Sequence, residues 1–241
     1  MEILSKTDRG LVRSDNQDYC LSGKISDNCA WAVVCDGMGG ANGGHTASTT
    51  ASEYIAREIQ NLYTNDFTKE ELVALMINIV VGANLEVYNI ARKNVELMGM
   101  GTTCELVFVR DSVAHIVHVG DSRTYLFRNN KMIQLTEDHS LVQEMVKRGE
   151  ITQEEARNHP NKNFITRAVG VRNFIETDYI EQELQPNDAI LICTDGLTNC
   201  VTDEEMTEIV KNNRGDIRVK KLVDKAKDGG GTDNITVIVI Q

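Results

Sequence analysis

The sequence predicts one domain that mixes α-helices with antiparallel β-strands, and three observations support this fold class. With 241 residues, 41% of them hydrophobic, the chain is long enough to bury a sizeable core. Two long segments, residues 46–62 and 69–95, carry apolar side chains at helical spacing. Short apolar runs bounded by Gly, Asp and Asn are typical of strands, and their succession over residues 103–127 favours an antiparallel meander.

In the first half of the chain, we expect six strands, which are separated by loops and by two long helices. The two long helices are amphipathic, so we expect them to cover one face of a sheet. The polar pair Asn129-Asn130 marks a turn after the last strand of the meander. The expected strands span residues 3–7, 19–21, 31–35, 103–109, 113–119 and 124–127.

In the second half of the chain, Asp138-His139-Ser140-Leu141 is expected to begin a helix that runs to Arg148. Gly149, a residue typical of helix ends, would end it. A short helix over residues 152–158 precedes Pro160. Residues 161–171 are polar and weakly periodic, which favours a flap between core strands. The remaining expected elements are strands 174–183 and 189–194, helices 203–212 and 217–227, and a last strand 235–240.

Composition excludes several classes of protein. The formal net charge of −11 opposes binding to a nucleic-acid backbone. The six cysteines lack C-x-x-C spacing and four of them lie in or beside apolar strands, so a disulfide framework is not expected. The sequence contains no run of about 18 apolar residues and no signal-peptide pattern. We therefore expect a cytoplasmic protein without a membrane or nucleic-acid partner.

Four aspartates mark the ends of predicted strands. Asp36 follows an apolar run and precedes Gly37, and Asp195 repeats this pattern more than 150 positions later. Asp121 ends a third strand, and Asp233 comes just before the last one. A single Asp-Gly pair is ordinary turn chemistry, but its repetition favours carboxylates that are held at strand ends to bind a hard cation.

Oxygen ligands without His or Cys clusters select Mg²⁺ or Mn²⁺ over Zn²⁺. His115 and His118 lie three positions apart on one strand, so they face opposite sides and are expected to be structural. A two-metal hydrolase follows as a hypothesis, because paired cations can activate water and clamp a phosphoryl group. Arg13 alone is best interpreted as a surface charge, but it would bind phosphate if the acids assemble beside it.

The residues resemble those of metal-dependent protein phosphatases of the protein phosphatase 2C (PPM) type, most of all the compact bacterial members. The resemblance runs in family order from residue 7 to residue 236, and its specificity comes from the whole series of segments. The matching segments are Thr7-Asp8-Arg9-Gly10-x-x-Arg13-x-x-Asn16-Gln17-Asp18, Asp36-Gly37-Met38-Gly39-Gly40, Gly101-Thr102-Thr103, Val119-Gly120-Asp121-Ser122-Arg123, Thr136-x-Asp138-His139-Ser140-Leu141, Thr166-Arg167-Ala168-x-Gly170, Thr194-Asp195-Gly196-Leu197-Thr198 and Gly231-Thr232-Asp233-Asn234-Ile235-Thr236.

This resemblance implies an α+β fold with four layers, αββα, in which two central antiparallel sheets are flanked by helices. Residues 1–241 would form one catalytic domain, and residues about 140–172 would form a small flap subdomain that screens substrates. The implied activity is hydrolysis of phosphoserine and phosphothreonine in proteins by a water that bridges two Mg²⁺ or Mn²⁺ ions, without a phosphoenzyme. A serine/threonine kinase would be the physiological opponent.

The resemblance also assigns roles to individual residues. Asp36 would bridge both metals, and Arg13 would bind the substrate phosphate. The full implied set is Asp18, Asp36, the carbonyl of Gly37, Asp195 and Asp233 for the metal pair, and Asp121, Asp195 and Asn199 for a weaker third metal.

Two positions depart from the family pattern. Some members have His after the Asp-Gly pair as an acid for the leaving group, whereas this chain has Met38. Position 199 often carries a ligand Asp, whereas Asn199 keeps an oxygen and loses the charge. Two alternatives stay open: a catalytically silent phosphoprotein-binding relative, and a phosphatase specialised for one regulatory protein. The silent relative would be expected to lose ligand acids, and this chain keeps them.

Overall fold

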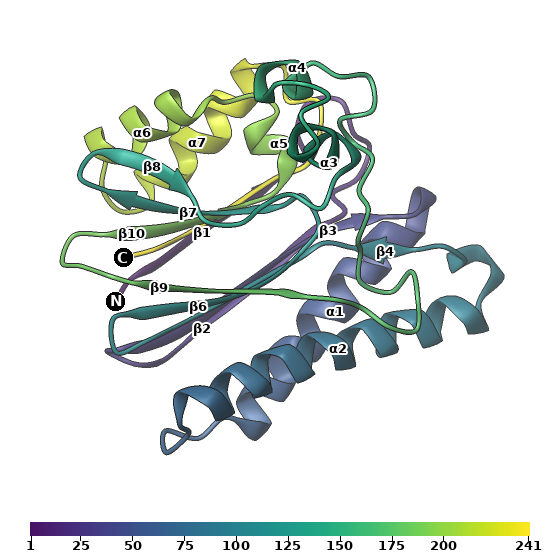
Figure 1. Cartoon of the computed structure of the whole chain (residues 1–241), viewed down its shortest axis with the longest axis horizontal. Coiled ribbons are helices and arrows are strands. Elements are labelled where there is room, and N and C mark those ends of the chain that lie inside the picture. The colour runs from purple at the N-terminus through teal and green to yellow at the C-terminus, as the bar shows by residue number, and fades with distance from the viewer.

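A computed structural model shows two antiparallel sheets packed face to face, with helices outside each sheet (Figure 1). The structure describes residues 1–241, except for the side chains of residues 41 and 42. This arrangement confirms the predicted mixture of helices and antiparallel sheets in four layers.

The first sheet joins strands from both ends of the chain. Each strand pairs with its neighbours in antiparallel fashion. Its spatial order is β1 (Ile3–Asp8), β11 (Ile235–Ile240), β10 (Ala189–Cys193), β7 (Arg123–Arg128) and β8 (Lys131–Gln134).

The second sheet is formed mainly by the first half of the chain. A short strand, β4 (Gly101–Thr102), pairs with the last residues of one of its members. The spatial order is β2 (Asp18–Ser26), β3 (Cys29–Met38), β5 (Cys104–Arg110), β6 (Val113–Val119) and β9 (Asp178–Glu183).

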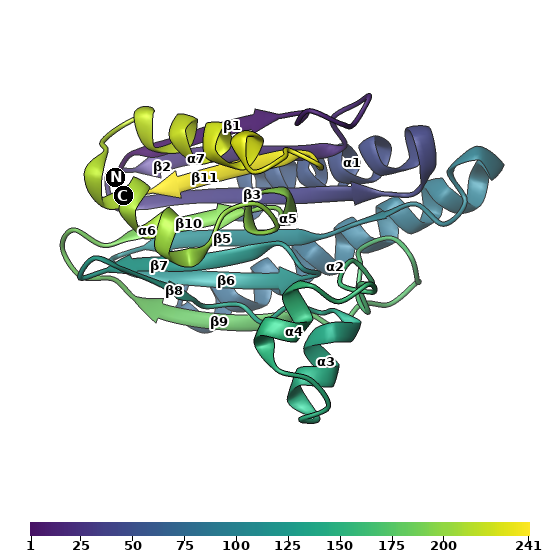
Figure 2. The same cartoon turned by 90° about the horizontal axis from the view of Figure 1, so that it is seen from above.

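The helices form the two outer layers and a projection from one edge of the sandwich (Figures 1 and 2). α1 (Gly40–Leu62) and α2 (Lys69–Lys93) cover the second sheet and are followed by the 3₁₀ turn η1 (Val95–Leu97). The outer layer of the first sheet consists of α5 (Asp195–Thr198), α6 (Asp203–Asn212) and α7 (Ile217–Asp228). The projection at the edge of the sandwich carries α3 (Leu141–Lys147) and α4 (Gln153–Arg157).

Successive side chains along a strand point to opposite faces of the sheet. Both faces are buried here, which explains why the strand sequences are almost continuously apolar. In β3, Val33 and Cys35 face the core under α1 and α2, whereas Ala32 and Val34 face the other sheet. Both faces of each central strand are therefore buried. The core between the two sheets includes Val34, Ile116, Leu126, Ile190 and Ile238.

The long helix α2 begins with a capping box in which Thr68 and Glu71 bond each other's backbone N–H groups. It is apolar and long enough to cross a membrane by length and composition, a property that core helices of soluble proteins share. Here Leu72, Met76 and Val80 are fully buried against the second sheet. The helix thus serves as the cover that the sequence predicts.

Four predictions from the sequence need correction. The meander is wrong, because β7 leaves β6 after Gly120 (φ 115°) and crosses to the first sheet. α1 begins at Gly40 rather than residue 46, and β9 begins at Asp178 rather than residue 174. Asp36 lies within β3 rather than at its end. By contrast, the turn at Asn129 and Asn130 is confirmed, and all six cysteines are free as expected.

Candidate active site

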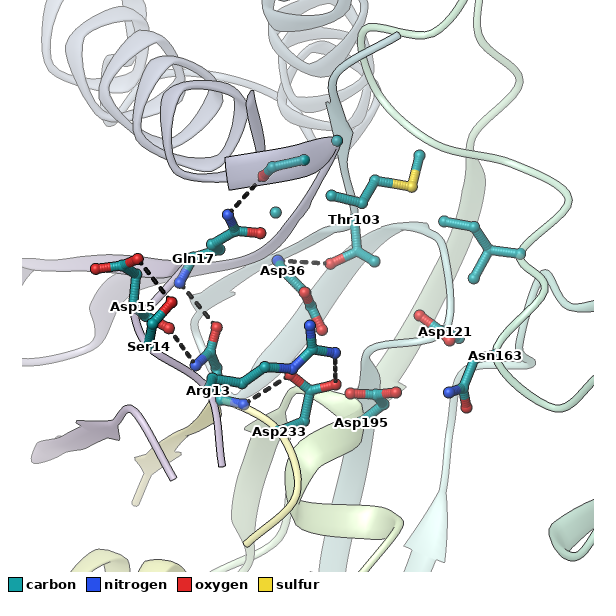
Figure 3. Close-up of a pocket in the computed structure, with 16 residues that line it drawn as sticks. Arg13, Ser14, Asp15, Gln17, Asp36, Thr103, Asp121, Asn163, Asp195 and Asp233 are labelled. Carbon is teal, nitrogen blue, oxygen red and sulfur yellow. Dashed lines mark hydrogen bonds and ion pairs between the residues drawn. The ribbon is translucent and has the colours of Figure 1, made fainter. Parts of the chain in front are cut away.

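A cavity of about 470 Å³ opens where ends of strands from the two sheets meet (Figure 3). Its lining combines five carboxylates, one of them Asp15 in the arginine's own loop, with one arginine. Figure 3 shows the side chains of Asp36, Asp121, Asp195 and Asp233 around the cavity, with Arg13 beside them. The structure therefore brings the four predicted aspartates together, and it satisfies the condition under which Arg13 is expected to bind phosphate.

Asp36 is held firmly because its backbone is bonded on both sides. Its N–H donates to Thr103 Oγ1 at 2.9 Å, and its carbonyl accepts from Thr103 N at 2.9 Å and from Thr102 Oγ1 at 2.8 Å. The carboxylate is thus free to project into the cavity from a rigid strand. The next residue, Gly37, is packed so closely that a Cβ there would lie 2.1 Å from Gly44 O. Only glycine fits at this position.

Asp18 lies beneath the cavity and faces Asp36 across the β2–β3 pair. It is 4% exposed, and its Oδ2 accepts hydrogen bonds from Thr194 Oγ1 at 2.9 Å and Thr236 Oγ1 at 2.7 Å. Both threonines belong to the first sheet or its edge, so Asp18 joins the two sheets. Its other oxygen, Oδ1, is buried without a hydrogen-bond partner among the described residues.

The loop that carries Arg13 is fixed by the segment that carries Asp233. Asn234 Nδ2 donates to Arg9 O and Asp15 O, each at 2.9 Å. Gly10 has a φ of 78°, and a Cβ there would lie 2.2 Å from Asp233 O, so glycine is required. Together these contacts position Arg13 so that its Nη2 donates to Asp233 Oδ2 at 2.7 Å.

The carboxylates perturb each other because they are crowded and poorly hydrated. Burial and repulsion from neighbouring carboxylates raise the pKa of Asp18 to about 7, and burial and repulsion from Asp233 raise the pKa of Asp195 to about 6. The same causes raise the pKa values of Asp36 and Asp121 well above their ordinary range. A bound cation would remove the repulsion among these carboxylates and would therefore stabilise the cluster.

The donor set fits hard divalent cations. Besides Asp18 Oδ1, the buried Asp195 Oδ1 also has no hydrogen-bond partner among the described residues. Carboxylate and carbonyl oxygens are what Mg²⁺ and Mn²⁺ prefer. In the described part of the chain, no group of three or more His, Cys, Asp or Glu side chains is already spaced to hold an ion, and Asp233 is paired with Arg13 instead. Cation binding would therefore have to draw Asp233 away from Arg13.

A second cavity, of about 280 Å³, shares Asp121 and Asp195 with the first and contains Asn199. Asn199 Nδ2 donates to Asp195 Oδ2 at 2.9 Å, and Asn199 Oδ1 accepts from Lys162 Nζ at 3.0 Å. The oxygen that could bind a third metal is thus occupied by an ammonium group. The structure places the three predicted third-site residues side by side, with Lys162 as a fourth member that the sequence did not indicate.

His139 fixes the loop that carries Asp121. His139 N donates to Gly120 O at 2.7 Å, and Gly120 N donates to His139 Nδ1 at 3.1 Å. Burial and the neighbouring His118 lower the pKa of His139 to about 4, so it is neutral and its Nδ1 can accept this bond. His118 in turn is hydrogen-bonded to the fully buried Glu105. These roles confirm the expectation that His118 is structural.

Sequence reasoning missed several residues that build the site. Thr194 and Thr236 anchor Asp18, and Asn234 anchors the arginine loop. Thr194 and Asn234 lie directly beside an aspartate, and Thr236 lies three positions after Asp233, all within segments that the resemblance covers. A polar side chain that interrupts an apolar strand, as Thr236 does in β11, was the available signal.

Comparisons with known proteins agree with this geometry. A family model described as protein phosphatase 2C matches residues 10–224. The serine/threonine phosphatase stp of Listeria monocytogenes is 40% identical over 240 residues, covering 98% of this chain and 94% of that protein.

Solved structures are similar over nearly the whole chain. Stp1 from Staphylococcus aureus, a serine/threonine phosphatase, has a TM-score of 0.93 at 32% identity, covering all of this chain and 95% of that one. The catalytic domain of the phosphatase PstP in complex with two manganese ions has a TM-score of 0.86 at 32% identity, covering 99% and 96%.

Proposed function

Because the chain belongs to the protein phosphatase 2C family, we propose that it is a metal-dependent serine/threonine protein phosphatase acting on phosphorylated proteins. The observation that carries this proposal is the cavity in which aspartates of both sheets surround a single arginine. Residues 1–241 would form one catalytic domain, in the cytoplasm, with residues 140–172 as its flap. The phosphorylated proteins would be supplied by an opposing serine/threonine kinase.

Two Mg²⁺ or Mn²⁺ ions would be held by the residues around this cavity. Asp18, Asp36 and the carbonyl of Gly37 suit one ion, and Asp36, Asp195 and Asp233 suit the other. When bound, such ions activate water for attack on phosphorus and neutralise phosphate charge. The neighbouring solved structure with two manganese ions supports a pair of this kind. A third ion at Asp121, Asp195 and Asn199 would have to displace Lys162 from Asn199 Oδ1.

The chain's own residues then orient the substrate. The Arg13 guanidinium, 54% exposed at its side chain, can turn from Asp233 to the phosphate once that carboxylate is neutralised. The rigid Asp36 backbone fixes the point at which attack occurs. Met38 lines the cavity at the position where some members of the family have His as an acid, and its thioether cannot protonate a leaving group. Water at the open cavity mouth would supply that proton.

Phosphate release from a phosphothreonine peptide tests the proposal directly. We expect release with Mn²⁺ or Mg²⁺ and none with chelator, because the carboxylates alone repel the phosphate. Metal-independent release would contradict the assigned chemistry. Binding of the peptide without release under any metal would favour the alternative, a catalytically silent phosphoprotein-binding protein.

Arg13→Ala should raise KM for the phosphothreonine peptide by roughly tenfold while changing kcat much less. A charge-assisted hydrogen bond to phosphate contributes about 1.5–3 kcal/mol, and it forms already in the bound substrate. Steady-state kinetics at saturating Mn²⁺ measure both constants. Arg13→Lys keeps the charge but loses the planar fork, so its KM should lie between the values for the wild type and for Arg13→Ala. Unchanged constants in Arg13→Ala would return this arginine to its interpretation as a surface charge.

A further inference from the structure

A third cavity, of about 460 Å³, lies next to the active-site cavity and is lined mainly by apolar side chains. Met38 and Ile165 line both cavities, so the two are continuous. A Cβ at Gly101 would lie 2.7 Å from Val171 Cγ2 and 2.9 Å from Met38 Cε, which shows that both side chains pack over this glycine. We call this cavity the apolar groove; its other apolar lining residues are Ala168, Phe174 and Ile175.

The apolar groove exposes large hydrophobic side chains on a well-fixed backbone. Phe174 is 59% exposed and Val171 is 43% exposed. Beneath them, the fully buried Asn84 of α2 donates to Arg172 O at 2.9 Å and accepts from Gly170 N at 2.7 Å. A buried asparagine that holds both sides of an exposed segment keeps the groove open and in shape. Such a preformed surface binds a ligand with little ordering cost.

Charged side chains of both signs lie at the rim of the apolar groove. The exposed Arg172 lines the groove and has no ion pair or side-chain hydrogen bond among the described residues. Arg167 also lines it, but its Nη1 already donates to Asp178 Oδ1 at 2.7 Å. The exposed Glu176 lines the same groove and carries the opposite charge, so the apolar lining of the groove, and not its net charge, would select a ligand.

We propose that the apolar groove binds a large apolar side chain of the substrate protein, close in sequence to the phosphorylated residue. The proposal rests on the proposed phosphatase function, because continuity with that cavity is what identifies the occupant as a phosphopeptide. While the phosphate lies near Arg13, the chain that leads away from it passes Met38 and Ile165 into the groove. The groove therefore selects among phosphoproteins by an apolar residue such as Leu.

Matched peptides test this selection. A set of phosphothreonine peptides carries Leu or Gly at each flanking position in turn, and kcat/KM is measured with Mn²⁺. We expect at least one flanking position at which Leu is preferred about tenfold over Gly, the size that an apolar pocket provides. Phe174→Ala should reduce that preference to about twofold. Hydrolysis of p-nitrophenyl phosphate, which is too small to reach the groove, should not change.

Phe164→Ala is the matched control, because Phe164 is 63% exposed in the same region and lines none of the three cavities. It should keep the preference for Leu. Two results would overturn the proposal. One is an equal kcat/KM for Leu and Gly peptides in the wild type, and the other is an equal loss of the preference for Leu in Phe174→Ala and Phe164→Ala. Fluorescence polarisation of the labelled peptides measures the preference for Leu as binding, without turnover. A protein that binds the Leu peptides more tightly but does not hydrolyse p-nitrophenyl phosphate would contradict the phosphatase function and not the role of the groove.

Discussion

Asp36→Asn should lower kcat by about a thousandfold, a loss of about 4 kcal/mol of transition-state stabilisation. The proposed pair of cations shares this one carboxylate, and the amide that replaces it carries no charge. The fold should survive, because Thr102 and Thr103 bond the backbone of residue 36 and not its side chain. Phosphate release at saturating Mn²⁺ and peptide measures kcat, and circular dichroism checks the fold.

Asp27→Asn provides the matched control for this change. Asp27 lies in the turn between β2 and β3, its side chain is 94% exposed, and it pairs only with Lys24 among the described residues. The same chemical substitution there should leave kcat at the wild-type value. Normal turnover by Asp36→Asn would rule out the metal roles assigned to this cavity.

The metal-free protein should become less stable as pH rises from about 4 to about 7, opposite to the usual behaviour of carboxylates. The folded-state pKa of Asp18 is about 7, whereas the ordinary value is 3.8. Over this range the folded protein keeps a proton that the unfolded chain releases, so stability is fully present below the lower pKa and is lost as pH rises through the higher one. We expect a loss of about 2–4 kcal/mol in the free energy of unfolding. Urea unfolding in chelator at several pH values measures it.

Saturating Mn²⁺ should reverse this loss, because a cation replaces the proton as the partner of the carboxylates. Asp18→Asn should be more stable than wild type in chelator at pH 7.5, since its amide oxygen can still accept from Thr194 and Thr236 without a charge to bury. In Mn²⁺ the order of stability should invert. A wild-type protein whose metal-free stability is the same at pH 4 and pH 7 would show that the cluster is not strained.

Much of the fold was predictable because its strands are buried on both faces. The run Ile235–Ile240 is apolar at every position but one, and the structure assigns the same bounds to β11. The aspartates were predictable as a set, because each interrupts or borders such a run. Their assembly around one cavity follows from strand ends that meet at one edge.

What the sequence could not predict depends on tertiary contacts. The crossing of β7 to the other sheet is invisible locally, because the segments before and after Gly120 have the same apolar alternation as a hairpin. The pairing of Arg13 with Asp233 joins residues 220 positions apart. The Lys162 contact to Asn199 likewise joins residues 37 positions apart, in a loop and at the end of α5. Local sequence propensity carries no signal for the strand crossing or for either of these two contacts.

The pairing of β1 with β11 has a consequence for synthesis of the protein on the ribosome. Asp18 is made early, but its bond to Thr236 spans 218 positions, and Asn234 anchors the arginine loop from across a similar separation. Until β11 has emerged, β1 has no partner strand and the cavity has no floor. The nascent chain therefore cannot complete this cavity before residues 235–240 have been made, however early its other residues fold.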